Sequence, residues 1–192
     1  MYNSSIKGQS KLMRFRMKED IPHEVFFNDM SKTYMREEFK SCDCVFSEIA
    51  WSYGYGIFNE RAGNSPNDYS EYMRNIQKLI LELNVPSFVV CGKPASKFFD
   101  KAESFPITID TSETNMPNCR LYVWNFDYTQ LFQRTSELMR FLSERFHKCL
   151  DFSCGYGEHL LKFDDFIGCD INKDCLTYLS ILKKEKDKHG KT

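Results

Sequence analysis

A glycine-containing segment near the end of the chain constrains its fold most strongly. The apolar pair Cys149-Leu150 leads into Asp151-Phe-Ser-Cys-Gly-Tyr-Gly157, and thirteen residues later a second apolar run ends in Asp170. A strand, a glycine turn, a short helix and a strand that ends in an acid form half of a nucleotide-binding βαβ unit. Glycines let the backbone approach a ligand closely, and the acid suits a ribose diol. The segment therefore predicts a parallel sheet and a nucleoside-bearing cofactor.

The chain length and the distribution of charge suggest one domain with basic ends. A chain of 192 residues with 15% aromatic side chains can bury a substantial core. The net charge of −1 gives no overall attraction to nucleic acid. Residues 1–18 contain five basic and no acidic residues, and both ends suit either phosphate contact or a solvated terminus. We expect a basic arm at 1–22, a single domain at 23–182 and a basic tail at 183–192.

The eight cysteines predict buried thiols rather than a metal site. None shows the paired spacing of a zinc site, and Cys42 and Cys44 stand too close together for a zinc knuckle. The sequence shows no signal-peptide pattern at its start and no apolar run near 18 residues, so neither a leader nor a membrane span is expected. We expect a reduced, cytoplasmic protein with no membrane partner.

Hydrophobic periodicity predicts alternating strands and helices. Strands are expected at 23–27, 43–46, 87–91, 106–109 and 120–124, and helices at 30–39, 69–83, 95–102, 129–146 and 173–188. Residues 52–68 are rich in Gly, Asn and Pro and are expected to form a long loop, of the kind that is usually functional or disordered. The alternation predicts a three-layer α/β sheet, mostly parallel, with an antiparallel edge pair from the strands at 106–109 and 120–124.

The order of the motifs resembles that of a known enzyme family. Phe126-Asp-Tyr-Thr-Gln130, a helix, the glycine turn and Asp170 follow one another as in the permuted (beta-type) DNA amino-methyltransferases. In the N-terminal half, Glu48-Ile-Ala-Trp51 stands where the family has its catalytic tetrapeptide. It follows Asp29 by about 19 residues, a spacing similar to that in the family. The resemblance covers roughly residues 23–180. It implies a Rossmann-like methyltransferase sheet in circularly permuted order.

The resemblance also implies the activity and its site. The family transfers a methyl group from S-adenosylmethionine to the exocyclic amine of adenine (N6) or cytosine (N4) in DNA. By position, Glu48 would orient the amine and Trp51 would stack on a flipped base. The cofactor would contact residues throughout the chain: Asp29, Thr129, Gln130, Asp151, Ser153, Gly155, Gly157 and Asp170.

The tetrapeptide departs from the family pattern. It lacks both prolines and has Glu48 where the family usually has Asp, Asn or Ser. An alternative is therefore a catalytically impaired protein that binds S-adenosylmethionine or nucleic acid. Residues 103–119 are the only candidate for a target-recognition insert, so a methyltransferase of RNA or of a small amine is a further alternative.

Other residues give weaker predictions. Tyr53, Tyr55, Arg61 and Lys93 combine aromatic rings and positive charge near the catalytic segment, which suits contact with a nucleic acid strand. A self-packed aromatic loop explains the same pattern. Glu158 and His159 suggest acid–base chemistry, but we expect them to face solvent at the start of a helix.

Overall fold

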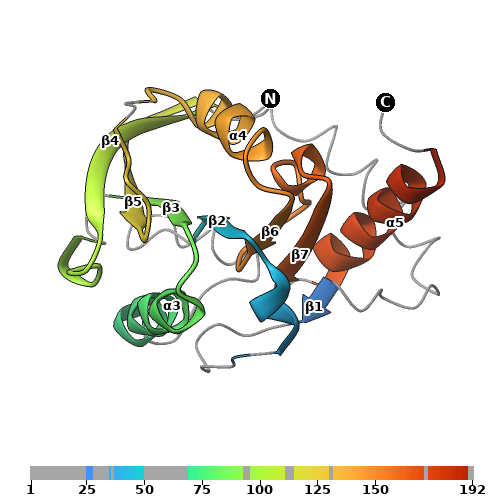
Figure 1. The fold of residues 1–192 in the computed structure, drawn as a ribbon, viewed down its shortest axis with the longest axis horizontal. Coiled ribbons are helices and arrows are strands. Elements are labelled where there is room, and N and C mark those ends of the chain that lie inside the picture. Colours follow the sequence, from blue (N-terminus) through green and yellow to red (C-terminus); the bar gives the residue numbers. More distant parts are fainter. Residues whose placement is uncertain are drawn as a thin grey trace.

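A computed structural model describes residues 25–27, 35, 37–49, 69–92, 96–110, 115–129, 132–170 and 173–189 of the chain. Its described strands form a seven-stranded sheet in the order β1-β7-β6-β2-β3-β5-β4 (Figure 1). The strands span β1 Val25–Phe27, β2 Cys44–Glu48, β3 Ser87–Cys91, β4 Glu103–Asp110, β5 Asn115–Trp124, β6 Lys148–Asp151 and β7 Asp165–Asp170.

The sheet has a parallel part and an antiparallel edge. Strands β1, β7, β6, β2 and β3 are all parallel, and β5 pairs antiparallel to both β3 and β4. Strands β2, β3 and β6 are almost entirely buried, as expected for parallel strands covered on both faces. The predicted α/β fold class, with its antiparallel edge pair, is confirmed.

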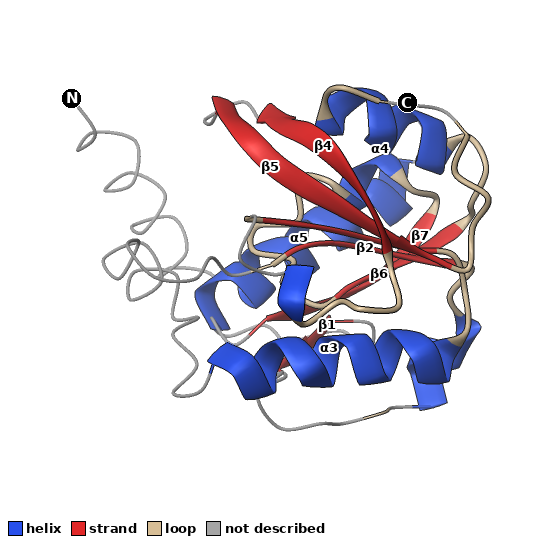
Figure 2. Cartoon of the chain, turned by 90° about the vertical axis from the view of Figure 1, so that its left-hand side faces the viewer, coloured by secondary structure: helices blue, strands red, loops and turns tan. Residues whose placement is uncertain are grey.

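Helices cover both faces of the sheet. Helix α3 (Tyr69–Leu83) lies on the face opposite α4 (Thr135–Ser143), as Figure 2 shows. The 3₁₀ helix η1 (Glu37–Ser41) contributes Phe39 to the α3 side. Helix α5 (Lys173–His189) and the 3₁₀ helix η3 (Leu160–Lys162) pack on the α4 side. The result is the expected three-layer arrangement.

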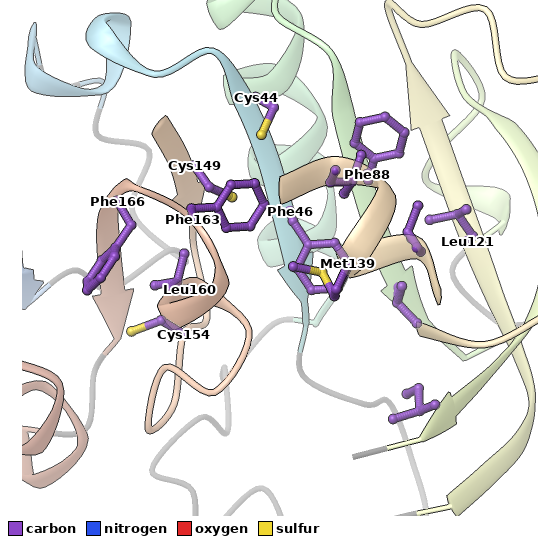
Figure 3. Packing of buried hydrophobic residues seen from close by; sticks show 14 of the residues in the cluster. Cys44, Phe46, Phe88, Leu121, Met139, Cys149, Cys154, Leu160, Phe163 and Phe166 are labelled. Carbon is purple, nitrogen blue, oxygen red and sulfur yellow. The ribbon is translucent and has the colours of Figure 1, made fainter. Parts of the chain in front are cut away.

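The core on the α4 side is built from residues that alternate along the strands. Cys44 and Phe46 of β2 point to this side and meet Leu160 and Phe163 of the segment after β6, together with Met139 of α4 (Figure 3). Their neighbour Val45 points to the α3 side instead. Such period-two alternation is what a strand between two helical layers requires. All eight cysteines are free and buried, which confirms the predicted thiols.

Helix α4 is shorter than its sequence pattern predicts. It begins at Thr135 rather than at 129, because the preceding residues are bound to β4. The amide of Thr108 donates to the carbonyl of Gln133 over 2.8 Å, and Asp110 accepts hydrogen bonds from the hydroxyl of Thr135 and the amide of Ser136. Asp110 therefore fixes the start of the helix from a neighbouring strand, which helical periodicity cannot show.

Other boundaries also differ from prediction. The described residues of the candidate insert, 103–110 and 115–119, instead belong to strands β4 and β5 at the edge of the main sheet. Of the short helix expected at 95–102, the described residues show 3₁₀ geometry at 96 and 97 only, followed by turns and a bend up to 102. Helix α5 ends at His189, one residue beyond the predicted limit of 188, so the basic residues from Lys183 onward begin within a helix. None of the described helices has the length and apolar character needed to cross a membrane.

Candidate cofactor and catalytic site

The carboxyl ends of three adjacent parallel strands bring acidic residues from distant parts of the chain to one sheet edge. Strands β7, β6 and β2 lie side by side and end in Asp170, Asp151 and Glu48. Phe27, the last residue of β1, pairs with Asp170 at the same edge. Ligands of open α/β sheets bind outside this edge. The fold therefore brings together the two sequence halves that carry the predicted site.

Asp151 is directed into the protein and ties the glycine turn to β2. It is 2% exposed, and its Oδ1 accepts hydrogen bonds from the Ser47 hydroxyl at 2.7 Å and the Ser153 amide at 3.0 Å. The Ser47 hydroxyl in turn accepts from the Phe152 amide at 2.7 Å. Burial raises the pKa of Asp151 to about 7, although these hydrogen bonds oppose the shift.

Asp170 supports the glycine turn from the neighbouring strand. The Gly155 amide donates to Asp170 Oδ2 over 2.9 Å, and the Cys154 amide donates to the carbonyl of Cys169 over 3.0 Å. Asp170 itself is 3% exposed. The turn is thus held against the end of β7, the position from which an acid would reach a bound ribose.

The two glycines of the turn have different surroundings. Both have positive φ, +49° at Gly155 and +78° at Gly157, a region that favours glycine. A Cβ at Gly157 would collide with the side chain of Leu179 in α5, whereas a Cβ at Gly155 would meet no other described atom within 4 Å. Gly157 lets α5 pack closely, whereas none of the described residues occupies the space beside Gly155, so within them a ligand could approach the backbone there.

Ser153 links the turn to the opposite helical layer. Its hydroxyl lies 3.0 Å from the hydroxyl of Tyr72, a buried residue of α3. The turn is therefore held by β2, by β7 and by α3 at once. Such multiple support keeps a binding loop in one conformation before the ligand arrives.

Glu48 contacts a histidine that sequence reasoning assigned to solvent. His159 Nε2 lies 3.4 Å from Glu48 Oε2, and the side chains are 14% and 24% exposed. The His159 ring also packs edge-on against Phe46, with ring centroids 5.1 Å apart. The expectation of a solvent-facing pair is correct for Glu158, which is exposed, and wrong for His159. Glu48 and His159 are far apart in the sequence, and the tertiary fold brings them together. In the sequence, the adjacent residues Glu158 and His159 were the signal that suggested a histidine with a chemical role here.

The remaining predicted site residues are placed less fully. Thr129 is exposed and follows Tyr128, whose ring packs 4.7 Å from that of Phe105 in β4. Its contact with a cofactor stays a prediction. The following predicted residues lie outside the described part of the chain: Asp29, Trp51, Tyr53, Tyr55, Arg61, Lys93 and Gln130. Among the described residues, no group of three or more His, Cys, Asp or Glu side chains could hold a metal ion.

Comparison with known proteins identifies the fold. No protein-family model and no curated protein sequence matches this chain. Among solved structures, it is similar to TTHA0409 of Thermus thermophilus, a candidate DNA modification methylase, at 11% identity and a TM-score of 0.50, covering 88% of this chain and 97% of that one. It is also similar to M1.HpyAVI at 14% identity and a TM-score of 0.48, covering 85% and 98%. The chain therefore has the α/β fold seen in a candidate DNA methylase.

A related solved structure contains a ligand. The M1.HpyAVI–SAM complex matches at 11% identity and a TM-score of 0.45, covering 82% of this chain and 97% of that one. At such identities the similarity concerns the fold alone, so residue roles depend on the geometry of this chain.

Proposed function

We propose that this protein is an S-adenosylmethionine-dependent methyltransferase that acts on the exocyclic amine of a DNA base. The observation that supports this most directly is the meeting of Glu48, the glycine turn and Asp170 at one edge of the sheet. Strand β6, which precedes the glycine turn, comes late in the chain yet lies between β7 and β2. That placement is what a circularly permuted motif order requires.

The residues of the turn fit a nucleoside-bearing cofactor. The open side of Gly155 leaves room for a ligand beside the backbone, and Asp170 stands at the strand end where ribose hydroxyls would be bound. Asp29 would accept a hydrogen bond from the adenine amine, and Thr129 and Gln130 would contact the methionine end. Asp151, Ser153 and Gly157 would act mainly by shaping the turn.

Glu48 and Trp51 are the proposed catalytic residues. S-adenosylmethionine supplies a methyl group that its sulfonium already activates, so the proposed reaction needs no metal. An exocyclic amine is a poor nucleophile because its lone pair is conjugated with the ring. A carboxylate that accepts a hydrogen bond from the amine N–H draws the nitrogen toward sp³ geometry and aims its lone pair, which is catalysis by positioning and electrostatics. As the new C–N bond forms, the bond from the methyl group to sulfur breaks, and the carboxylate can take the proton that the methylated nitrogen loses.

The substrate must leave its duplex to reach this edge. Trp51 would stack on the flipped base, and Tyr53, Tyr55, Arg61 and Lys93 would contact the strand beside it. RNA is the alternative nucleic acid. Residues 103–110 and 115–119 belong to strands of the main sheet instead of forming a separate recognition module, which favours the alternative of RNA or a small amine as the substrate.

Cofactor calorimetry combined with tritiated-methyl transfer onto DNA and RNA tests the proposal. We expect Asp170→Ala to weaken cofactor binding, and Glu48→Ala to retain binding but lose transfer. Full turnover by Glu48→Ala would contradict the role of Glu48. Transfer to RNA alone would replace DNA as the substrate.

A cofactor-binding protein without transferase activity is the second candidate. The tetrapeptide has no prolines, and the carboxylate of Glu48 is already in contact with His159. Tight cofactor binding with no transfer to DNA, RNA or small amines would favour this candidate.

A further inference from the structure

His159 approaches the catalytic strand from the cofactor side of the site. It follows the glycine turn, and its backbone carbonyl accepts a hydrogen bond from the Lys162 amide at 3.2 Å. The ring covers Phe46, which lies two residues before Glu48 and so on the same face of β2. One imidazole thus contacts Phe46 and Glu48, the last two residues on this face of β2.

The protonation pattern of the contact follows from its chemistry. A carboxylate only accepts hydrogen bonds, so the 3.4 Å contact is a hydrogen bond in the tautomer of His159 that carries its hydrogen on Nε2. The other nitrogen, Nδ1, is buried and has no hydrogen-bond partner within the described part of the chain. The ring is therefore held by packing against Phe46 and by its bond to Glu48, which gives this bond an orienting role.

We infer that His159 is a positioning residue for Glu48, an inference that rests on the proposed function. By donating to Oε2, it fixes the carboxylate so that Oε1 can accept the proton of the substrate amine. Residues 48–51 contain no proline to stiffen the backbone, and the glutamate side chain has one more rotatable bond than aspartate. His159 supplies the missing restraint from another element.

The contact between His159 and Glu48 also connects the segment after the proposed cofactor turn with the proposed catalytic carboxylate. His159 lies in the segment that leaves the cofactor turn, where the Leu161 amide donates to the carbonyl of Gly157 at 3.2 Å. Glu48 lies at the end of β2, whose own partners are β3 and β6. Through His159, the conformation of the cofactor turn determines where the catalytic carboxylate points.

The test compares His159→Gln with His159→Leu. Glutamine keeps an N–H donor near the position of Nε2, whereas leucine keeps much of the apolar contact with Phe46 and removes the donor. A carboxylate displaced by about 1 Å can lower a rate by about 100-fold. In single-turnover methyl transfer we expect a loss of this order for His159→Leu, recovery of most of the rate for His159→Gln, and an unchanged cofactor Kd for both.

Imidazole NMR of the cofactor-free protein gives a reading that needs no activity. The Nε2–H signal of His159 should be visible in the wild-type protein and should broaden in Glu48→Ala, because the acceptor is gone. Transfer by the wild-type protein together with an undiminished rate for His159→Leu would overturn the inference while leaving the proposed function intact. A wild-type protein that transfers no methyl group would overturn the proposed function and with it the positioning role, even if the NMR contact were present.

Discussion

Asp151 and Asp170 end neighbouring strands, yet their environments differ. Asp151 accepts hydrogen bonds from Ser47 and Ser153 inside the protein, whereas Asp170 accepts one from the amide of Gly155 in the glycine turn. The sequence could place both acids at a candidate site because parallel strands end at one edge. It could not distinguish them, because the partner Ser47 comes from a strand more than a hundred residues away.

The titration of Asp151 predicts a particular pH dependence of stability. Its pKa is raised from 3.8 to about 7, so between these values the folded protein binds its proton more tightly than the unfolded chain. The free energy of unfolding should therefore fall as pH rises from about 4 to about 7. Asp151→Asn keeps an acceptor for Ser47 and Ser153 but cannot ionise, so its urea-unfolding curve should lack this decline. If the free energy of unfolding changed with pH in the same way for the wild-type protein and the variant from pH 4 to 8, the raised pKa of Asp151 would be contradicted.

Gly155 and Gly157 form a matched pair for separating folding from binding. At Gly157 a Cβ would meet Leu179 as well as a positive φ, so Gly157→Ala should destabilise the protein strongly. At Gly155 no described atom would meet a Cβ, so alanine there should cost about 1–2 kcal/mol for the positive φ. We expect Gly155→Ala to fold but to bind cofactor more weakly, as measured by chemical denaturation and calorimetry. Equal loss of stability in both variants would mean that Gly155 does not border a ligand space.

At the scale of elements, local patterns predicted best where burial alone decides the structure. Helix α3 and strand β3 have the predicted limits, because a strong apolar face and a fully apolar run allow few alternatives. Helix α4 was mispredicted because β4 binds the residues before it. The contact of His159 with β2 was missed for the same reason, since both depend on partners distant in sequence.

A buried lysine joins α5 to the sheet. Lys183, which is 9% exposed, donates to Asp165 Oδ1 at 2.7 Å and to the carbonyl of Phe166 at 3.1 Å. Lys148 of β6 lies 3.0 Å from the other Asp165 oxygen. Burial opposes ionisation of Asp165, but the hydrogen bonds from Lys183 and Lys148 lower its pKa to about 2. The residue expected to begin a basic tail is therefore part of the packed helix.

Removing this carboxylate should destabilise the protein except in acid. Because the folded pKa lies below the ordinary 3.8, the stabilisation is present above about pH 4 and disappears as pH falls toward 2. Asp165→Asn should lower the free energy of unfolding at pH 7 by about 1–2 kcal/mol, a figure reduced because a third of the side chain is exposed. The matched control is Asp164→Asn, whose partner His147 is 68% exposed and which should change stability less. Equal losses in the two variants would contradict the role of Lys183.

For the whole molecule, the strand order suggests that a circularly permuted chain, with its ends joined and a new start elsewhere, could adopt the same fold. Strands β7 and β1 are parallel neighbours, and α5 contacts both of them. Joining the end of α5 to β1 through residues 190–192 and 1–24 would turn β7, α5 and β1 into one continuous βαβ unit. The new chain ends would then lie between α4 and β6, where Glu144 and Arg145 are exposed. Such a chain would start with the strand of the glycine turn.

We expect this rearranged chain, which starts at Arg145 and ends at Glu144, to fold and to bind cofactor with the wild-type Kd. The new opening separates no paired strands, and Asp43 still holds the start of β6 through the amides of His147 and Lys148, at 2.8 and 3.0 Å. A control opened between Gly155 and Tyr156 cuts the glycine turn, so it should lose cofactor binding. Circular dichroism and calorimetry of the two chains make the comparison. If the first chain fails to fold, the direct connection from α4 to β6 contributes more to the fold than the sheet order suggests.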